Sequence, residues 1–191
     1  MTDKERFTTI LKEECKDRFD VREFINWLEE KTDFFDAPAS SKYHLSERGG
    51  LLKHSLNVYD TLVNICSLYA EEIPLSTIAI VGLLHDICKI NFYSQERTYV
   101  KVDGKWIEKW GYVIQDNFPI GHGEKSVIIL QQHFKLTKDE IMAIRWHMAG
   151  FDYAVKGGES AYSKATLSCK LLSLLEISDM LSSRILEGNW N

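Results

Sequence analysis

The sequence of 191 residues contains only four cysteines, and their spacing rules out the common cysteine-based sites. They are Cys15, Cys66, Cys88 and Cys169, and none forms the CxxC pair of a zinc knuckle or a thioredoxin-like motif. Three of them lie inside apolar helical patterns, where a free thiol acts as a small hydrophobic side chain. We therefore expect reduced thiols and a reducing compartment.

Long hydrophobic runs are also missing. The longest apolar stretch, Ile78–Leu84, is far shorter than the roughly 20 residues that span a bilayer. The first residues, MTDKERF, are charged and carry no apolar signal segment. We therefore expect a cytoplasmic protein with no membrane partner.

No cluster of basic residues stands out, and the net charge is −5. Binding of long nucleic acid through bulk electrostatics needs clustered Lys and Arg, so we do not expect it here. A small nucleotide or a strand end stays open as a ligand, because a bound cation can reverse the local field. We expect a small-molecule partner, and a homo-oligomer is compatible with the sequence.

The composition is that of an ordinary globular domain, with 45% hydrophobic and 27% charged residues. A chain of this length buries a core without disulfides or structural metals, so a bound metal would serve chemistry. No repeat, low-complexity tract or long linker divides it. We expect residues 1–191 to form a single domain, in which residues 1–36 are a helical extension packed on the core.

Apolar residues recur mostly at helical spacing, which predicts an all-α fold. Asp20 is a predicted N-cap, Pro74 separates two helices, and Thr137 with Glu140 forms a predicted capping box. The predicted helices cover residues 3–16, the segment after Asp20, 51–69, 75–89, 121–134, 137–148 and 164–186.

One segment, at about 98–114, follows a β pattern instead. Two alternating runs flank Asp103-Gly104, a strong signal for a tight turn, and a third short run covers Trp110–Ile114. The sequence therefore predicts a small hairpin inserted into the helical bundle. We interpret its aromatic side chains as local core or an oligomer contact rather than a base-stacking surface. Stacking would nevertheless suit a nucleotide enzyme, which makes the hairpin a candidate lid. The aromatic residues concerned are Tyr99, Trp106, Trp110 and Tyr112.

Polar side chains occupy apolar helical faces at several places, namely His54, His85, His147 and Asp179. Asp179 has no basic residue three or four positions away. A lone ionised carboxylate in an apolar stripe would cost on the order of several kcal/mol. Asp179 therefore needs a partner or a cation from elsewhere in the fold.

These residues, with Asp86 and His122, are spread over nearly every predicted helix of the central and C-terminal chain. Neighbouring helical residues point about 100° apart, so His85 and Asp86 reach one ion only from a helix end. Several helices converging on a shared cation is a common metal site in helical bundles. Four imidazoles and two carboxylates suit Mn²⁺, Fe²⁺, Co²⁺, Ni²⁺ or Zn²⁺, and six ligands suit two ions that share a carboxylate.

Three strings resemble the HD-domain superfamily of metal-dependent phosphohydrolases: GGLLKHSLNV around His54, LLHDICKI around His85-Asp86, and LEISDMLSSRI around Asp179. The resemblance covers residues 49–187 and implies an HD-type helical core there. Two further strings, PIGHGEKS and IRWHMAG, are similar to the two-metal branch. That branch includes HD modules of bacterial 3′-to-5′ exoribonucleases and cyclic-dinucleotide phosphodiesterases.

The resemblance implies a role for each matching residue. The first ion would be held by His54, His85, Asp86 and Asp179, and the second by His122 and His147, with Asp86 bridging the two. Lys89 matches a lysine that lies near substrate phosphate, so Asp86 and Lys89 are the candidate catalytic residues. Cys88 departs from the family pattern, which has a small Gly there. The absence of a GYP signature argues against cyclic di-GMP, and the absence of a preceding OB domain argues against an exoribonuclease.

The sequence therefore predicts a phosphodiesterase or nucleotidase that cleaves a phosphoester bond in a nucleotide or related small phosphoester by metal-activated water. Two alternatives stay open: a catalytically silent HD module that binds a nucleotide in a regulatory role, and a 3′-end nuclease. We interpret His133 as structural or exposed and His44 as a surface residue, although its loop could reach the cleft. Arg145 and Arg184 are interpreted as surface charges.

Overall fold

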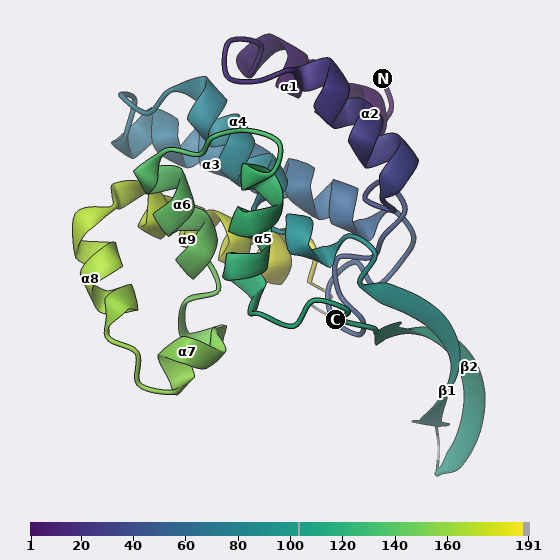
Figure 1. The fold of residues 1–191 in the computed structure, drawn as a ribbon. Helices are drawn as coiled ribbons and strands as arrows, with labels where there is room; N and C mark the ends of the chain where they lie inside the picture. Colours follow the sequence, from purple (N-terminus) through teal and green to yellow (C-terminus); the bar gives the residue numbers. More distant parts are fainter. Residues whose placement is uncertain (103, 189–191) are drawn as a thin grey trace.

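The computed structural model describes residues 1–102 and 104–188, which form a bundle of helices with one protruding β-hairpin (Figure 1). This architecture confirms the predicted all-α bundle with an inserted hairpin. In chain order the elements are α1 (Asp3–Glu14), α2 (Val21–Lys31), α3 (Gly50–Tyr69), α4 (Leu75–Leu84), β1 (Tyr93–Val102), β2 (Lys105–Ile114), α5 (His122–Gln131), α6 (Lys138–Trp146), α7 (Tyr153–Lys156), α8 (Ala161–Ser168) and α9 (Lys170–Leu181).

Two of the helices begin at the capping residues expected from the sequence. Asp20 accepts a hydrogen bond from the backbone N–H of Glu23, and Thr137 with Glu140 forms the predicted capping box. The predicted helix 75–89 is shorter than expected, because α4 ends at Leu84 and a separate 3-10 turn covers Ile87–Lys89. The end of α4 therefore carries the His85-Asp86 pair, as their adjacency requires.

The prediction of one continuous helix over 164–186 is wrong. Cys169 adopts an extended backbone conformation (φ −133°, ψ 96°) between α8 and α9. A π-helical turn, Ser182–Leu186, then follows α9. Apolar residues continue on both sides of Cys169, so the periodicity alone did not mark the break.

The apolar core lies between α3, α4, α6 and α9. Leu62, Leu84, Ile144 and Leu172 are among its fully buried side chains. Helix α4 is apolar on nearly every side, which fits its position between α1, α3 and α6. This packing directs the C-terminal ends of α4 and α6 toward the same region of the bundle.

The N-terminal helices are joined to this bundle through packing and one buried ion pair. Phe7 of α1 and Leu28 of α2 are fully buried in the same core. Arg18 donates two hydrogen bonds of 2.8 Å to the carboxylate of Glu140, whose side chain is fully buried. The hydroxyl of Thr77 in α4 donates a third, at 2.9 Å. The loop between α1 and α2 is thus held against both α4 and α6.

The hairpin consists of two antiparallel ten-residue strands that extend away from the helices (Figure 1). It begins at Tyr93, earlier than predicted, because the polar residues 94–97 pair with residues 110–113 and gain their strand conformation from that partner. The expected third run is simply the end of β2. Its turn residue Asp103 lies outside the described residues.

The interpretation of the hairpin aromatics as local core is wrong for three of the four residues, whereas Tyr112 is half-buried. Tyr99, Trp106 and Trp110 are 63%, 69% and 62% exposed. A two-stranded hairpin has no second layer to cover either face, so these rings lie in solvent.

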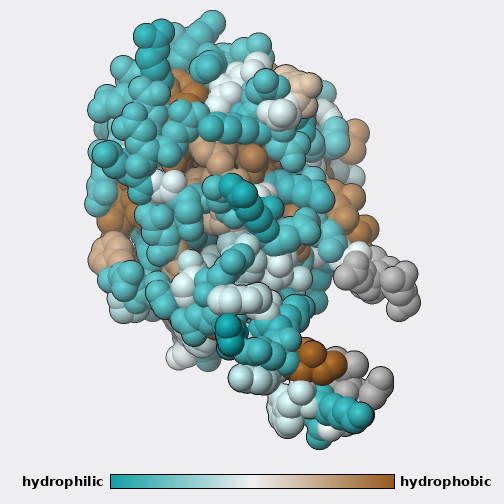
Figure 2. All heavy atoms as spheres, turned by 90° about the vertical axis from the view of Figure 1, so that its right-hand side faces the viewer, coloured by the Kyte–Doolittle hydropathy of each residue, from teal (hydrophilic) through white to brown (hydrophobic). Residues whose placement is uncertain are grey.

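Within the described residues, no helix combines the length and the apolar character needed to span a membrane. On the face drawn in Figure 2, hydrophobic side chains gather in small patches separated by hydrophilic ones. The hairpin stands apart from the body at the lower right of that view.

Candidate metal centre

Two of the buried histidines lie at helix ends and are oriented by backbone carbonyls. His85 follows the last residue of α4 and His147 follows that of α6. Their Nδ1 atoms lie 3.1 Å and 2.7 Å from the carbonyl oxygens of Gly82 and Ile144, which helix ends leave free. A carbonyl only accepts, so each Nδ1 donates its proton and each Nε2 keeps its lone pair.

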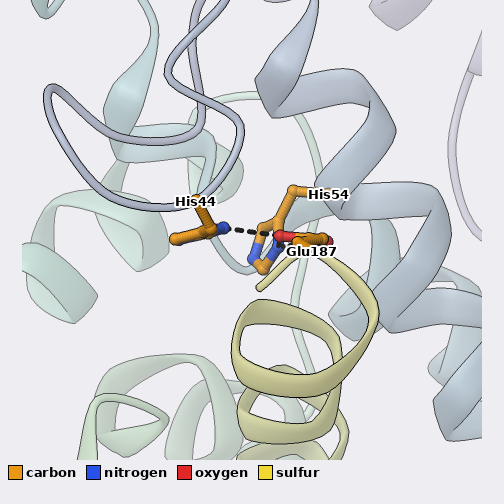
Figure 3. A group of neighbouring side chains, drawn as sticks. All are labelled: His44, His54 and Glu187. Carbon is orange, nitrogen blue, oxygen red and sulfur yellow. Dashed lines mark hydrogen bonds and ion pairs between the residues drawn. The ribbon is translucent and has the colours of Figure 1, made fainter. Parts of the chain in front are cut away.

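His54 is oriented by a carboxylate instead. It lies in the second turn of α3 with its side chain 1% exposed, and its Nδ1 lies 3.1 Å from each carboxylate oxygen of Glu187 (Figure 3). A carboxylate behind the Nδ1 of a histidine is the usual second partner of a metal-ligating imidazole. The Nε2 of His54 therefore faces the same region as those of His85 and His147.

These three Nε2 atoms are buried and have no hydrogen-bond partner among the described residues. Buried polar atoms are normally satisfied, and each one left without a partner costs about 1–3 kcal/mol. Three such nitrogen atoms beside carboxylates form a ligand set that a divalent cation would satisfy. The residues present therefore fit the metal that the sequence predicts.

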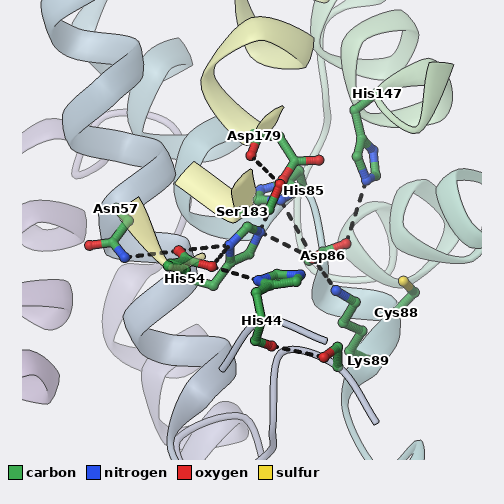
Figure 4. Close-up of polar contacts among 12 residues, drawn as sticks. His44, His54, Asn57, His85, Asp86, Cys88, Lys89, His147, Asp179 and Ser183 are labelled. Carbon is green, nitrogen blue, oxygen red and sulfur yellow. Dashed lines mark hydrogen bonds and ion pairs between the residues drawn. The ribbon is translucent and has the colours of Figure 1, made fainter. Parts of the chain in front are cut away.

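The carboxylate of Asp86 lies between His147 on one side and His54 with His85 on the other (Figure 4). Its Oδ2 is 3.6 Å from the Nε2 of His54 and 3.6 Å from that of His85. Its Oδ1 is 2.6 Å from the Nε2 of His122 and 3.5 Å from that of His147. One oxygen for each group is the arrangement that a carboxylate needs to bridge two ions.

The spacing of the other ligand atoms is close to that of a metal site. Atoms that coordinate one ion at about 2.1 Å and at tetrahedral or octahedral angles lie roughly 3.0–3.4 Å apart. Oδ1 of Asp179 lies 3.3 Å from Nε2 of His54. Ligand atoms of His85, His147 and Asp179 also lie within 4.8 Å of one another, so His147 is near both groups. The structure thus brings together all six residues predicted as metal ligands.

Cys88 lies at the edge of this centre, beside His122. Its Sγ is 3.4 Å from the Nδ1 of His122, and Asp86, Cys88 and His122 together form a further group that could hold an ion. His122 is the first residue of α5, and 26% of its side chain is exposed. The residue that departs from the family pattern is therefore a potential thiolate ligand.

Lys89 places a positive charge at the centre. Its Nζ donates a hydrogen bond of 2.6 Å to Oδ2 of Asp86, and its side chain is 13% exposed (Figure 4). Burial lowers the pKa of Lys89, but the Asp86 carboxylate outweighs it and raises that pKa above its ordinary value. The ammonium is therefore charged at neutral pH.

The histidines differ in protonation because their surroundings differ. Burial lowers the pKa of His85 to about 3, so this imidazole is neutral, as a metal ligand must be. Burial also acts on His54, but Asp179 and Glu187 outweigh it and raise the pKa to about 9. These surroundings favour a positive charge at His54, either a proton or, in its place, a bound metal ion.

A family model for the HD domain matches residues 51–183, which is more than half of the chain. The chain belongs to the HD domain family. The HD family comprises metal-dependent phosphohydrolases. No curated protein and no solved structure matches the chain.

Two residues of the centre lie outside the matched part of the HD domain, His44 and Glu187. The Nδ1 of His44 lies 2.5 Å from Oε2 of Glu187 (Figure 3). Asn57 donates its amide N–H to Oε1 of Glu187 at 2.8 Å. The interpretation of His44 as a surface residue is wrong, since its side chain is 17% exposed and its loop reaches the centre. Glu187 was not among the predicted site residues.

The π-helical turn is the reason that sequence periodicity missed Glu187. On a regular α-helix, the residue seven positions after Asp179 shares its face, and that residue is Leu186. A π turn contains one residue more than an α-helical turn, so Glu187 lies on the face of Asp179 in place of Leu186. Leu186 is 62% exposed instead. Such π turns are frequent at functional sites.

Other polar residues considered in the sequence lie outside the centre. His133 packs against Trp27 with ring centroids 4.0 Å apart, in agreement with a structural role. Arg145 is not a free surface charge, because its side chain is 15% exposed and pairs with Glu124 and, at 2.9 Å, with Asp152. The guanidinium of Arg184 lies 5.6 Å from the ring centroid of Phe151.

Proposed function

We propose that this HD domain hydrolyses a phosphoester bond in a nucleotide or a related small phosphoester, using two divalent transition-metal ions. The observation that carries the proposal is the position of Asp86, with one oxygen toward His54 and His85 and the other toward His122 and His147. The unpartnered Nε2 atoms around it support cation binding.

The donor set indicates which ions would bind and where. Imidazole with carboxylate suits Mn²⁺, Fe²⁺, Co²⁺, Ni²⁺ or Zn²⁺. The first ion would be held by His54, His85, Asp86 and Asp179, and the second by Asp86, His122 and His147. When bound, such a pair lowers the pKa of a water molecule and stabilises the charge that develops on the phosphoryl oxygens.

Lys89 is the side chain that would interact with the phosphate group of the substrate. Its charged ammonium is mostly buried, so its field acts through a medium of lower dielectric than water. It can donate a hydrogen bond to a phosphoryl oxygen and stabilise the charge there. Asp86 orients Lys89 as well as the imidazoles, and for this reason we assign both residues to catalysis.

A substrate panel tests this proposal. Metal-loaded protein should hydrolyse at least one compound among generic phosphodiesters, phosphomonoesters and nucleotides, and a chelator should abolish turnover. Asp86→Asn should reduce the rate by about 100-fold or more. The matched control is Asp60→Asn, an exposed carboxylate of α3 paired with Arg6, which should retain the rate.

If metal-loaded protein hydrolysed no compound of the panel, the proposed hydrolase activity would be contradicted. Nucleotide binding without turnover, retained in Asp86→Ala, would instead favour a regulatory binding module.

We also propose that residues 1–191 act as a single domain. The fully buried Glu140, held by Arg18 from the N-terminal segment, supports this. Thermal unfolding should then show one transition, and separate transitions for the N-terminal helices and the bundle would contradict it.

A further inference from the structure

The hairpin presents a surface that the proposed hydrolysis leaves without a role. Tyr93 pairs with Ile114, and Lys101 with Trp106. Opposed residues of an antiparallel pair share a face, and successive residues of a strand alternate between faces. All five aromatic residues of the two strands therefore lie on one face, here called the aromatic face: Tyr93, Tyr99, Trp106, Trp110 and Tyr112.

The two faces of the hairpin differ in chemistry. The aromatic face also carries Arg97 and Lys101, and the guanidinium of Arg97 lies 5.7 Å from the ring centroid of Trp110. Glu108, its one acidic residue, is paired with Arg97 at 3.3 Å. The opposite face has aliphatic side chains such as Val100 and Ile107 but no aromatic ring. Flat rings are thus gathered on one side only, whereas both faces carry two basic residues, the opposite face through Lys105 and Lys109.

The aromatic face begins at the metal centre. Tyr93, the first residue of β1, follows Lys89 by four positions in the chain, and its ring lies 6.4 Å from that of Tyr112. From Tyr93 to Lys101 the strand rises through eight residues, roughly 26 Å at about 3.3 Å each. The row of rings therefore leads outward from the place where the scissile phosphate would lie.

We propose that the aromatic face binds a single-stranded oligonucleotide, whose bases stack on the rings while one phosphate lies at the metal centre. The placement of that phosphate rests on the proposed function. Nucleobases stack on aromatic side chains without regard to sequence, whereas the aliphatic face offers no such contact. A surface of roughly 26 Å spans several nucleotides, while a mononucleotide would cover one end.

The charge of the hairpin favours the same ligand. Residues 93–114 contain four basic and three acidic residues, a positive excess in a chain whose net charge is −5. A second copy of this chain fits less well, because a two-fold contact through the aromatic face would bring Arg97 and Lys101 close to their own counterparts. A phosphate backbone would neutralise both cations.

Fluorescence anisotropy of a fluorescein-labelled single strand of six thymidines tests the proposal. The titration contains chelator, so that no hydrolysis occurs. We expect saturable binding that Trp110→Ala or Trp106→Ala weakens by about 5-fold or more. The matched control is Ile107→Ala, which removes a side chain of similar position and 48% exposure from the opposite face and should change the affinity less than about 2-fold.

Three results would overturn the proposal: no binding by the wild-type protein, equal effects of the tryptophan and isoleucine variants, or a dimer in sedimentation that Trp110→Ala dissociates. Circular dichroism checks that the variants keep the helical bundle. Because binding is measured without metal, oligonucleotide binding without turnover would count against the hydrolase alone. Turnover of small phosphoesters without oligonucleotide binding would count against the hairpin site alone.

Discussion

Replacing Glu187 by Gln should weaken binding of the metal ion held by His54 by about 10- to 100-fold, the usual effect of losing a ligand's second partner. Glu187 lies 3.1 Å from Nδ1 of His54, and its side chain is 1% exposed. Its negative charge therefore acts on the imidazole through a medium of low dielectric. Gln keeps the shape and one accepting oxygen but removes the charge. The expected loss corresponds to about 1.4–2.7 kcal/mol.

The effect should be confined to the ion held by His54, because His147, a proposed ligand of the second ion, is oriented by a backbone carbonyl that the substitution leaves in place. Calorimetric titration of Mn²⁺ into chelator-stripped protein measures both affinities, and the visible spectrum of bound Co²⁺ reports the coordination geometry. Ile185→Gln is the control, since Ile185 lies in the same π turn and is 54% exposed. An affinity of Glu187→Gln within about 2-fold of wild type, or an equal loss in the control, would refute the reasoning.

Three further predictions concern stability and the second ion. Arg18→Ala should lower the free energy of unfolding by about 2–4 kcal/mol, because it leaves Glu140 buried without its main partner. The control Lys4→Ala, in the exposed pair with Glu29, should lower it by less than about 1 kcal/mol, and urea denaturation measures both. Burial raises the pKa of Glu140, but Arg18 and the Thr137 N–H outweigh it and hold that pKa below the ordinary value of 4.5. The stabilisation by ionised Glu140 is therefore complete above pH 4.5 and is lost as pH falls through the folded-state pKa. Urea denaturation at several values between about pH 6 and pH 3 should therefore show a smaller loss of unfolding free energy in Arg18→Ala than in the wild type. Gly123→Ala should lower the free energy of unfolding by about 1–3 kcal/mol and abolish binding of the second metal ion, because a Cβ there would lie 2.1 Å from the carbonyl oxygen of Arg145 and push α5 away from α6. An unchanged melting temperature and metal content would contradict this prediction.

The metal centre was largely predictable because its residues break a local pattern. A histidine or aspartate on an apolar helical face is visible in the sequence, and His54, His147 and Asp179 were identified that way. The adjacency of His85 and Asp86 predicted a helix end, and α4 does end there.

Other features depended on geometry that spacing does not encode. The π turn that directs Glu187 toward His54 changes the helical register, so periodicity assigned Leu186 to that face. The loop that carries His44 has no periodic pattern, and its position depends on a contact with a residue 143 positions away. Strand β1 begins in a polar segment whose conformation is set by its partner β2.

Metal content per chain tests the central claim most directly. Elemental analysis of protein purified without chelator or affinity-tag nickel, with reloading where needed, should give about two transition-metal ions per chain. Asp86→Ala should lose both, because its two oxygens face both groups of imidazoles. One ion per chain would contradict the bridging role of Asp86, and none after reloading would contradict the metal centre itself.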